Sequence, residues 1–172
     1  MKKVITVIMT LLLLAGCMSD VTRELDKERY DAYMTSYQSI LGEENKLTKS
    51  QNYDTELVVN KLADGSYRYD VIIDSPRVAM YQIKALAVID DLSGQIDKEN
   101  MMPSVGILDD AIYNMMPNTL DKDKGFVAGL TLSLVSDKPQ LRIGLMVEYI
   151  DSSKVSSKRE YITLFASYTD GN

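Results

Sequence analysis

Apolar and polar residues alternate with a period of two along most of the chain beyond residue 52. The clearest run is 141–149, in which every second residue is apolar. Similar runs occupy 53–60, 67–74, 126–134 and 161–166, and short polar stretches separate them. Side chains of a β-strand point to opposite faces in turn, so this period predicts strands with one buried face. A chain patterned in this way is constrained to build antiparallel sheets.

Two further stretches depart from simple alternation. The run 78–89 is apolar on both faces, which predicts a central strand covered on both sides, with a helix on one of them. The segment 104–117 fits either a helix capped by Ser104 or a bent extended strand. Because Pro103 and Pro117 bracket it closely, we expect irregular extended structure. Turn signals stand at Asp64-Gly65 and at 136–139.

Residues 20–42 carry a different period. Apolar side chains recur there at spacings of three and four, and polar side chains fall mainly between them. The apolar positions are Val21, Leu25, Tyr30, Tyr33, Met34, Tyr37, Ile40 and Leu41. With Ser19 or Asp20 as the N-cap and Gly42 as the C-cap, this spacing predicts one amphipathic helix. We expect its tyrosines to pack on the domain with their hydroxyls near the rim; the alternative is an exposed binding stripe.

Six predicted strands and one helix define the expected fold class. It is mainly β with an N-terminal helix: an antiparallel two-layer β-sandwich, immunoglobulin-like in character, with the helix packed alongside. The alternative is a single curved antiparallel sheet packed on the helix, an α+β arrangement. In either case the polar residues 43–52 form the connection between the helix and the first strand.

The first 17 residues have the features of a secretory signal. Lys2 and Lys3 precede an apolar stretch, 4–14, that only two threonines interrupt. This stretch is shorter than the roughly 20 residues that span a bilayer core, and small residues follow it. The tetrapeptide Leu14-Ala15-Gly16-Cys17 resembles the lipobox of bacterial lipoproteins.

This resemblance covers residues 1–17 and implies a lipid anchor. In that class the signal is cut between Gly16 and Cys17, and the Cys17 thiol receives a diacylglyceryl group. Two or more acyl chains, such as palmitate, make the attachment to a membrane stable. We therefore expect an extracytoplasmic domain on the cell membrane, or on the outer membrane of a host with two. The expected segments are 1–16 (signal), 17–19 (anchor), 20–42 (helix) and 43–172 (β-rich domain).

Composition argues against several classes of function. The chain has no histidine, so neither a Ser-His-Asp nor a Cys-His catalytic set can form within it. Its single cysteine, if acylated, leaves no disulfide and no free thiol. The net charge of −6 becomes −8 when the signal, with its two lysines, is removed. Such an acidic domain repels phosphate backbones, so we expect no nucleic-acid partner, and no motif indicates a cofactor.

Acidic residues provide the only candidates for a metal site, and they are weak ones. Asp121 and Asp123 stand at the spacing that begins a calcium loop, but positions five, six and twelve of that loop hold unsuitable residues. We therefore expect 121–125 to be a solvated strand connection. The pairs Asp90-Asp91 and Asp109-Asp110 flank the same long connection. They would hold a hard cation only by converging with Asp121 and Asp123.

The pairs Met101-Met102 and Met115-Met116 are unusual for a connection between strands. Methionine is adaptable and common at promiscuous binding surfaces, so an exposed cluster with Tyr113 would contact a peptide or a lipid. Capture of copper(I) by the thioethers is a further alternative. We expect instead that these side chains form the underside of a loop folded onto the core.

These observations favour a non-enzymatic binding or accessory domain, whose partner is a protein or a cell-envelope polymer. The loops 90–120 and 151–158 would make the contact, which requires an exposed concave or apolar patch on them. One alternative is a structural subunit of an envelope complex, docked through an exposed helix face. Another is a small carboxylate-only hydrolase, which needs two acidic side chains facing each other across a cleft, about 5–10 Å apart.

Overall fold

The structure is a computed structural model that describes residues 26–90 and 101–169. Residues 26–42 form the described part of the helix, and a 3-10 helix, η1, spans Lys122–Lys124. The strands are β1 (Asp54–Lys61), β2 (Tyr67–Asp74), β3 (Tyr81–Ile89), β4 (Ser104–Val105), β5 (Gly129–Ser136), β6 (Gln140–Ile150) and β7 (Ser157–Ser167).

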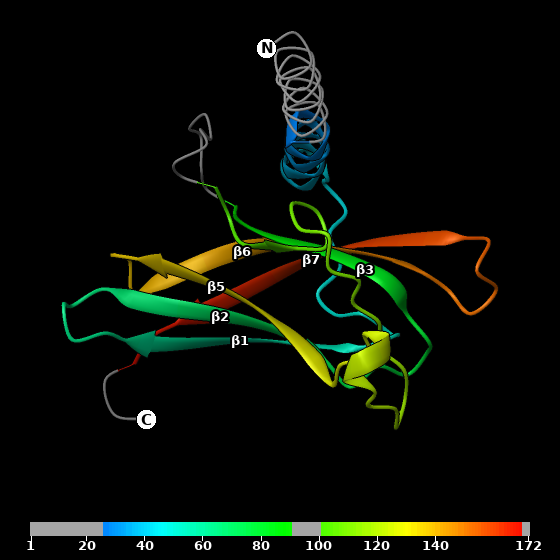
Figure 1. The fold of residues 1–172 in the computed structure, drawn as a ribbon. Helices are drawn as coiled ribbons and strands as arrows, with labels where there is room; N and C mark the ends of the chain where they lie inside the picture. The colour runs from blue at the N-terminus through cyan, green and yellow to red at the C-terminus, as the bar shows by residue number, and fades with distance from the viewer. Residues whose placement is uncertain (1–25, 91–100, 170–172) are drawn as a thin grey trace, which may run out of the picture.

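The strands form two antiparallel sheets that pack as two layers. One sheet has the order β1-β2-β5, and the other has the order β4-β3-β6-β7. The C-terminal part of the helix packs on the outer face of the four-stranded sheet, and the helix rises away from it (Figure 1). The predicted two-layer sandwich is therefore confirmed, and the alternative of a single curved sheet is wrong. The helix prediction is confirmed for 26–42, while residues 20–25 lie outside the described residues.

The main core fills the space between the two sheets, as the alternation predicts. Every second residue of β6 points into it, as do Leu130, Leu132 and Leu134 of β5. The buried residues of β6 in this layer are Leu141, Ile143, Leu145, Val147 and Tyr149. Burying each such aliphatic side chain contributes roughly 1.5–3 kcal/mol to stability. The core of the sandwich thus rests on the strongest sequence pattern in the chain.

A second core lies between the four-stranded sheet and the helix. Its fully buried members are Tyr33, Tyr37, Ile40, Leu86, Val88 and Met146. They come from the helix and from the faces of β3 and β6 that point away from the main core. Both β3 and β6 are therefore covered on two sides, which confirms the prediction for β3. Of the tyrosine face that one version of the subunit hypothesis needs exposed, Tyr33 and Tyr37 are buried against the sheet and Tyr30 is half-buried.

Close approach of the helix depends on a glycine of β6. A Cβ atom on Gly144 would lie 2.6 Å from Cγ2 of Ile40, well inside van der Waals contact. The Tyr33 hydroxyl accepts a hydrogen bond from the Met102 amide at 2.7 Å and donates to the carbonyl of the same residue at 3.3 Å. Packing and a paired hydroxyl together hold the helix against the sheet.

Element boundaries differ from the prediction in four places. The strand predicted from residue 78 begins at Tyr81, the one predicted from 126 begins at Gly129, and the one predicted from 161 begins at Ser157. Leu47, expected in the polar connection, pairs with β7 through backbone hydrogen bonds. The segment 104–117 is extended and irregular, apart from the short β4, as predicted.

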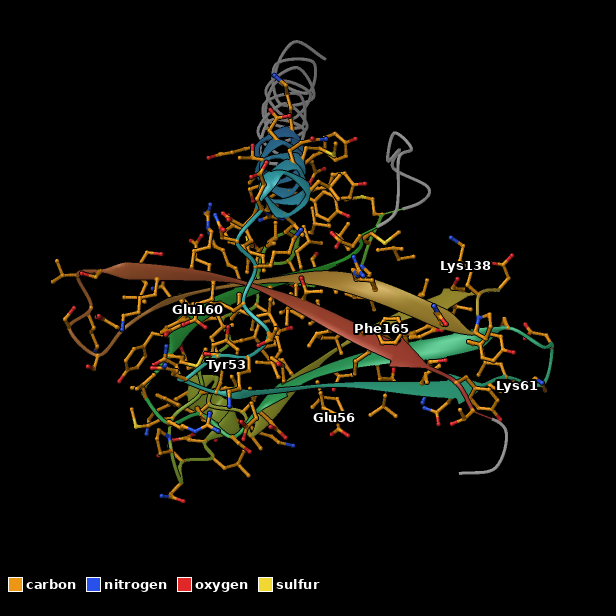
Figure 2. All side chains as sticks on the ribbon, turned by 180° about the vertical axis from the view of Figure 1, so that it is seen from behind. Tyr53, Glu56, Lys61, Lys138, Glu160 and Phe165 are labelled. Carbon is orange, nitrogen blue, oxygen red and sulfur yellow. The ribbon has the colours of Figure 1, made fainter. Side chains whose placement is uncertain are left out.

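A cluster of polar atoms is buried where β1, β6 and β7 meet (Figure 2). The rings of Tyr53 and Tyr149 meet edge to face at 6.3 Å, and Glu160 Oε1 accepts from Asn52 Nδ2 at 2.7 Å. Burial, with the nearby Glu160 carboxyl second, raises the pKa of Tyr149 to about 12. The Tyr149 hydroxyl makes no hydrogen bond within the described part of the chain.

Tyr33, whose hydroxyl is hydrogen-bonded, and Tyr149, whose hydroxyl is not, give a matched pair of substitutions. We expect Tyr33→Phe to lower the free energy of unfolding by about 1–2 kcal/mol, because it leaves the amide and carbonyl of Met102 unpaired. Tyr149→Phe should leave stability unchanged or raise it slightly, because it removes a buried hydroxyl that has no partner. Urea unfolding followed by circular dichroism measures both variants. We call the pair of hydrogen bonds between the Tyr33 hydroxyl and the Met102 backbone the clamp. Equal losses of unfolding free energy in the two variants would contradict this role of Tyr33.

Candidate functional site

The connection between β4 and β5 folds back beside the start of β3. Met80 and Met115 exchange backbone hydrogen bonds of 2.8 and 2.9 Å, and the Ile83 amide donates to the Tyr113 carbonyl at 2.8 Å. Residues 113–116 are thereby held as an extended segment along 80–83. This pairing gives the loop a fixed surface on which side chains are positioned.

Asn114 joins three parts of this region. Its side chain is one of two polar side chains buried in the described ranges, with 7% of its surface exposed. Oδ1 accepts from the Gln82 amide at 2.9 Å, and Nδ2 donates to the Lys124 carbonyl at 3.2 Å. The backbone of Asn114 also pairs with Gly125 and Val127. One amide side chain therefore ties β3 and η1 together next to the chain entering β5.

Asp121, the first of the two weak metal candidates, caps η1. Its carboxylate accepts from the Lys124 amide at 3.3 Å and from Lys124 Nζ at 2.9 Å. The hydrogen bond from the Lys124 side chain holds the pKa of Asp121 below its usual value. Gly125 ends the turn at a φ of 71°, where a Cβ would lie 2.5 Å from the Ile112 carbonyl oxygen. Asp123 is exposed within η1. The candidate calcium loop is thus a capped turn.

The other acidic candidates bind neighbours of their own. Asp90 pairs with Lys46 at 3.0 Å, and both side chains are largely buried. Asp110 pairs with Arg29 of the helix, and Asp109 accepts from the Ala111 amide at 3.1 Å. Asp91 lies outside the described residues. Across the described ranges, no three acidic or cysteine side chains gather closely enough to hold a metal ion.

A hollow of about 320 Å³ lies where β2 ends and β5 begins. The residues that line it are Asp74, Ser75, Pro76, Met116, Asn118, Thr119, Leu120, Val127 and Ala128. Five of these are apolar, and a single one, Asp74, is ionisable. Leu120 is 64% exposed beside the hollow, which is a large apolar exposure for a loop residue. The hollow therefore combines an apolar lining with an accessible apolar anchor.

A second hollow, of about 250 Å³, lies between the start of β3 and the residues that precede 113. It is lined by Gln82, Ile83, Lys84, Gly106, Asp109, Asp110, Ala111 and Ile112. Ile112 is 61% exposed. The loops predicted to make contact therefore carry the exposed concave and apolar surface that the binding hypothesis requires.

Left-handed backbone conformations gather around these hollows. Ser75 (φ 47°) and Asn118 (φ 56°) line the first, and Gln82 (φ 51°) lines the second. A non-glycine residue in this region stores conformational strain, and such strain clusters at binding and active sites. The fourth non-glycine residue with a left-handed φ, Lys154, stands in the loop 151–158, where Val155 is highly exposed.

The methionine pairs lie mainly beneath the surface. Met115 is fully buried in the main core, while Met101 and Met102 are half-buried against the helix core. The expectation that they form the underside of a folded loop is confirmed for Met115 and holds in part for Met101 and Met102. Met116 is the exception, because it lines the first hollow.

Sequence reasoning missed Asn114, Ser75 and Leu120 as residues of the site. One signal, next to Leu120, was present in the sequence. Pro117-Asn118 occupies the two central positions of a turn, which the Thr119 amide closes by donating to the Met116 carbonyl at 3.2 Å. Proline followed by a residue that tolerates positive φ is typical of a type II turn. Nothing in the local pattern distinguishes Asn114 from a surface asparagine.

Comparisons with known proteins found no family model, no curated protein and no solved structure that matches this chain. Among the described residues, no helix has the length and apolar character needed to cross a membrane.

Asn114 generates a stability prediction. Asn114→Ala leaves the Gln82 amide and the Lys124 carbonyl without partners, so we expect a loss of about 1–3 kcal/mol. Amide hydrogen exchange should accelerate more in residues 80–83 and 113–127 than in β6 and β7. Asn118→Gly is the control, because glycine adopts its φ freely, and its effect should stay within about 0.5 kcal/mol. Unchanged exchange in the Asn114 variant would overturn the role of this side chain.

Proposed function

We propose that this chain is a membrane-anchored extracytoplasmic lipoprotein whose domain binds a protein partner and is not itself an enzyme. The anchor rests on the lipobox Leu14-Ala15-Gly16-Cys17. The observation that carries the binding role is the apolar hollow with Leu120 exposed beside it. Any acyl chains on Cys17 would hold the domain at a membrane surface.

The position of the hollow suits this role. Residues 113–128 and η1 lie on the side of the sandwich away from the helix (Figure 1). The described helix precedes the sandwich in the chain, and an anchor at Cys17 would attach on the helix side. A surface on the opposite side would then face away from the membrane, where an envelope protein can reach it.

The lining of the hollow favours a protein over a polymer or a hydrolysable substrate. It contains no aromatic ring, although aromatic side chains are prominent in most small-ligand sites. It also contains a single carboxyl group, that of Asp74, whereas carboxylate-only hydrolysis requires two facing groups. Aliphatic side chains of a partner would fill such a hollow and bury Leu120 at the same time.

A cysteine substitution tests the anchor. We expect the mature protein to begin at Cys17 and to carry a diacylglyceryl group, measured by mass spectrometry of the N-terminal peptide from membranes. Cys17→Ser should abolish incorporation of labelled palmitate and leave the signal attached. Ser19→Ala, a neighbouring change that keeps the thiol, should behave as the wild type. An unmodified Cys17 thiol in the wild-type protein would refute the anchor.

A pair of photo-crosslinking positions tests the binding surface. We expect a crosslinking amino acid at Leu120 of the full chain to give a discrete protein adduct in intact cells. Phe165 on β7, which is 60% exposed, is the matched control and should give none. Ala128→Phe fills the hollow from an exposed position, so it should reduce the adduct at Leu120 by about tenfold, equivalent to about 1.4 kcal/mol of binding. Identical adducts at both positions, or an adduct unaffected by Ala128→Phe, would count against this site.

A further inference from the structure

We infer that β5 is a pairing edge through which two copies of this chain join their three-stranded sheets. β5 (Gly129–Ser136) pairs with β2 on one side along its whole length. No described residue beyond β2 forms a backbone hydrogen bond with it, so its other side is an open sheet edge (Figure 1). This inference goes beyond the proposed function and depends neither on the anchor nor on the hollow.

The other sheet edges are shielded. β1 carries Asp54, Glu56 and Lys61, and it lies beside β7 at the meeting point of the two sheets. β7 is covered in part by Leu47, whose amide donates to Tyr161 at 2.7 Å and whose carbonyl accepts from Thr163 at 2.8 Å. β4 is two residues long. Charge, covering segments and shortness are the usual means by which proteins protect sheet edges from pairing.

β5 has none of these protections. Its eight residues include no charge and no proline, and its register with β2 runs without a bulge. Thr131, Ser133 and Val135 point outward and are exposed, while the leucines between them are buried in the main core. A neutral, eight-residue edge without a bulge presents a row of unpaired amide and carbonyl groups, which is a template for another strand.

The charge of the protein favours a second copy of this chain as the partner that supplies a strand to the open edge of β5. The protein carries a net charge of −6, so two copies repel each other except where both surfaces are neutral. Antiparallel pairing of β5 with its own copy brings only neutral side chains face to face. Asp70 of β2, the register partner of Ser133, accepts from Arg68 Nε at 2.9 Å and from Ser133 Oγ at 2.6 Å.

The side chains of β5 are also self-complementary. A two-fold axis at Ser133 places Thr131 of one copy opposite Val135 of the other, a pair of β-branched residues that suits adjacent strands. Each contact then occurs twice, as in any isologous interface. The product is a continuous sheet of order β1-β2-β5-β5-β2-β1.

Cysteine crosslinking of the full chain in its own membranes tests this pairing. Ser133→Cys should give a covalent dimer on mild oxidation, because the axis places this residue opposite its own copy. Thr131→Cys or Val135→Cys alone should give little, since each lies about four residues along the strand from its own copy, whereas the two co-expressed should give a mixed covalent dimer. Ser152→Cys, in the exposed loop 151–158, is the matched control, and the wild-type chain gives the background from Cys17. Crosslinking at β5 no greater than at Ser152, or an adduct between β5 and a different protein, would overturn the inference.

Exchange of charges across the β5–β5 interface provides a second, independent test of this pairing. In the Ser133→Cys background, Thr131→Lys with Val135→Lys places like charges across the interface and should reduce the dimer about tenfold. Thr131→Glu with Val135→Glu should do the same. Co-expression of the lysine and glutamate variants should restore the dimer as a mixed species. A dimer that persists in the lysine variant alone would show that another surface makes it.

Discussion

Burial of β3 and β6 on both faces is the constraint on which the rest of the structure depends. One face of each strand forms the main core with the three-stranded sheet, and the other packs against the helix. The C-terminal part of the helix therefore covers the second face of these strands, and Gly144 leaves the space that Ile40 occupies. With no disulfide available within the described residues, these two cores must supply the stability of the fold.

The same constraint explains where the exposed surface lies. Layers on both sides of β3 and β6 leave irregular chain only at the ends and edges of the sandwich. The connection between β4 and β5 spans one such end, and Asn114 fixes it there by pairing with both Gln82 and Lys124. A loop held at several backbone points can keep Ser75 and Asn118 in left-handed conformations and keep a hollow open between them.

The sequence predicts the elements whose side chains repeat with a regular period. It does not predict features that depend on a single tertiary contact. The alternation in 141–149 predicts β6 well, because its apolar positions all face the main core. It placed the start of β5 too early, because Phe126 continues the alternation yet packs its ring on Tyr81, at 6.1 Å, as part of the loop. Leu47 joins β7 through backbone atoms, which leave no trace in side-chain pattern. Asn114 was invisible for a similar reason, since its partners are backbone groups distant in sequence. The resemblance to a lipobox rests on a local motif and stays a prediction, because residues 14–17 lie outside the described residues.

The clamp between Tyr33 and Met102 has a mechanical consequence. Tension applied at the N-terminal side of the helix passes through Tyr33, Tyr37 and Ile40 into the four-stranded sheet, where β6 and β7 are paired over eleven residues. Residues 113–116 are joined to the same sheet by backbone hydrogen bonds to Met80 and Ile83. The helix and the loop that carries the hollow are therefore attached to one sheet, which fixes their position relative to each other.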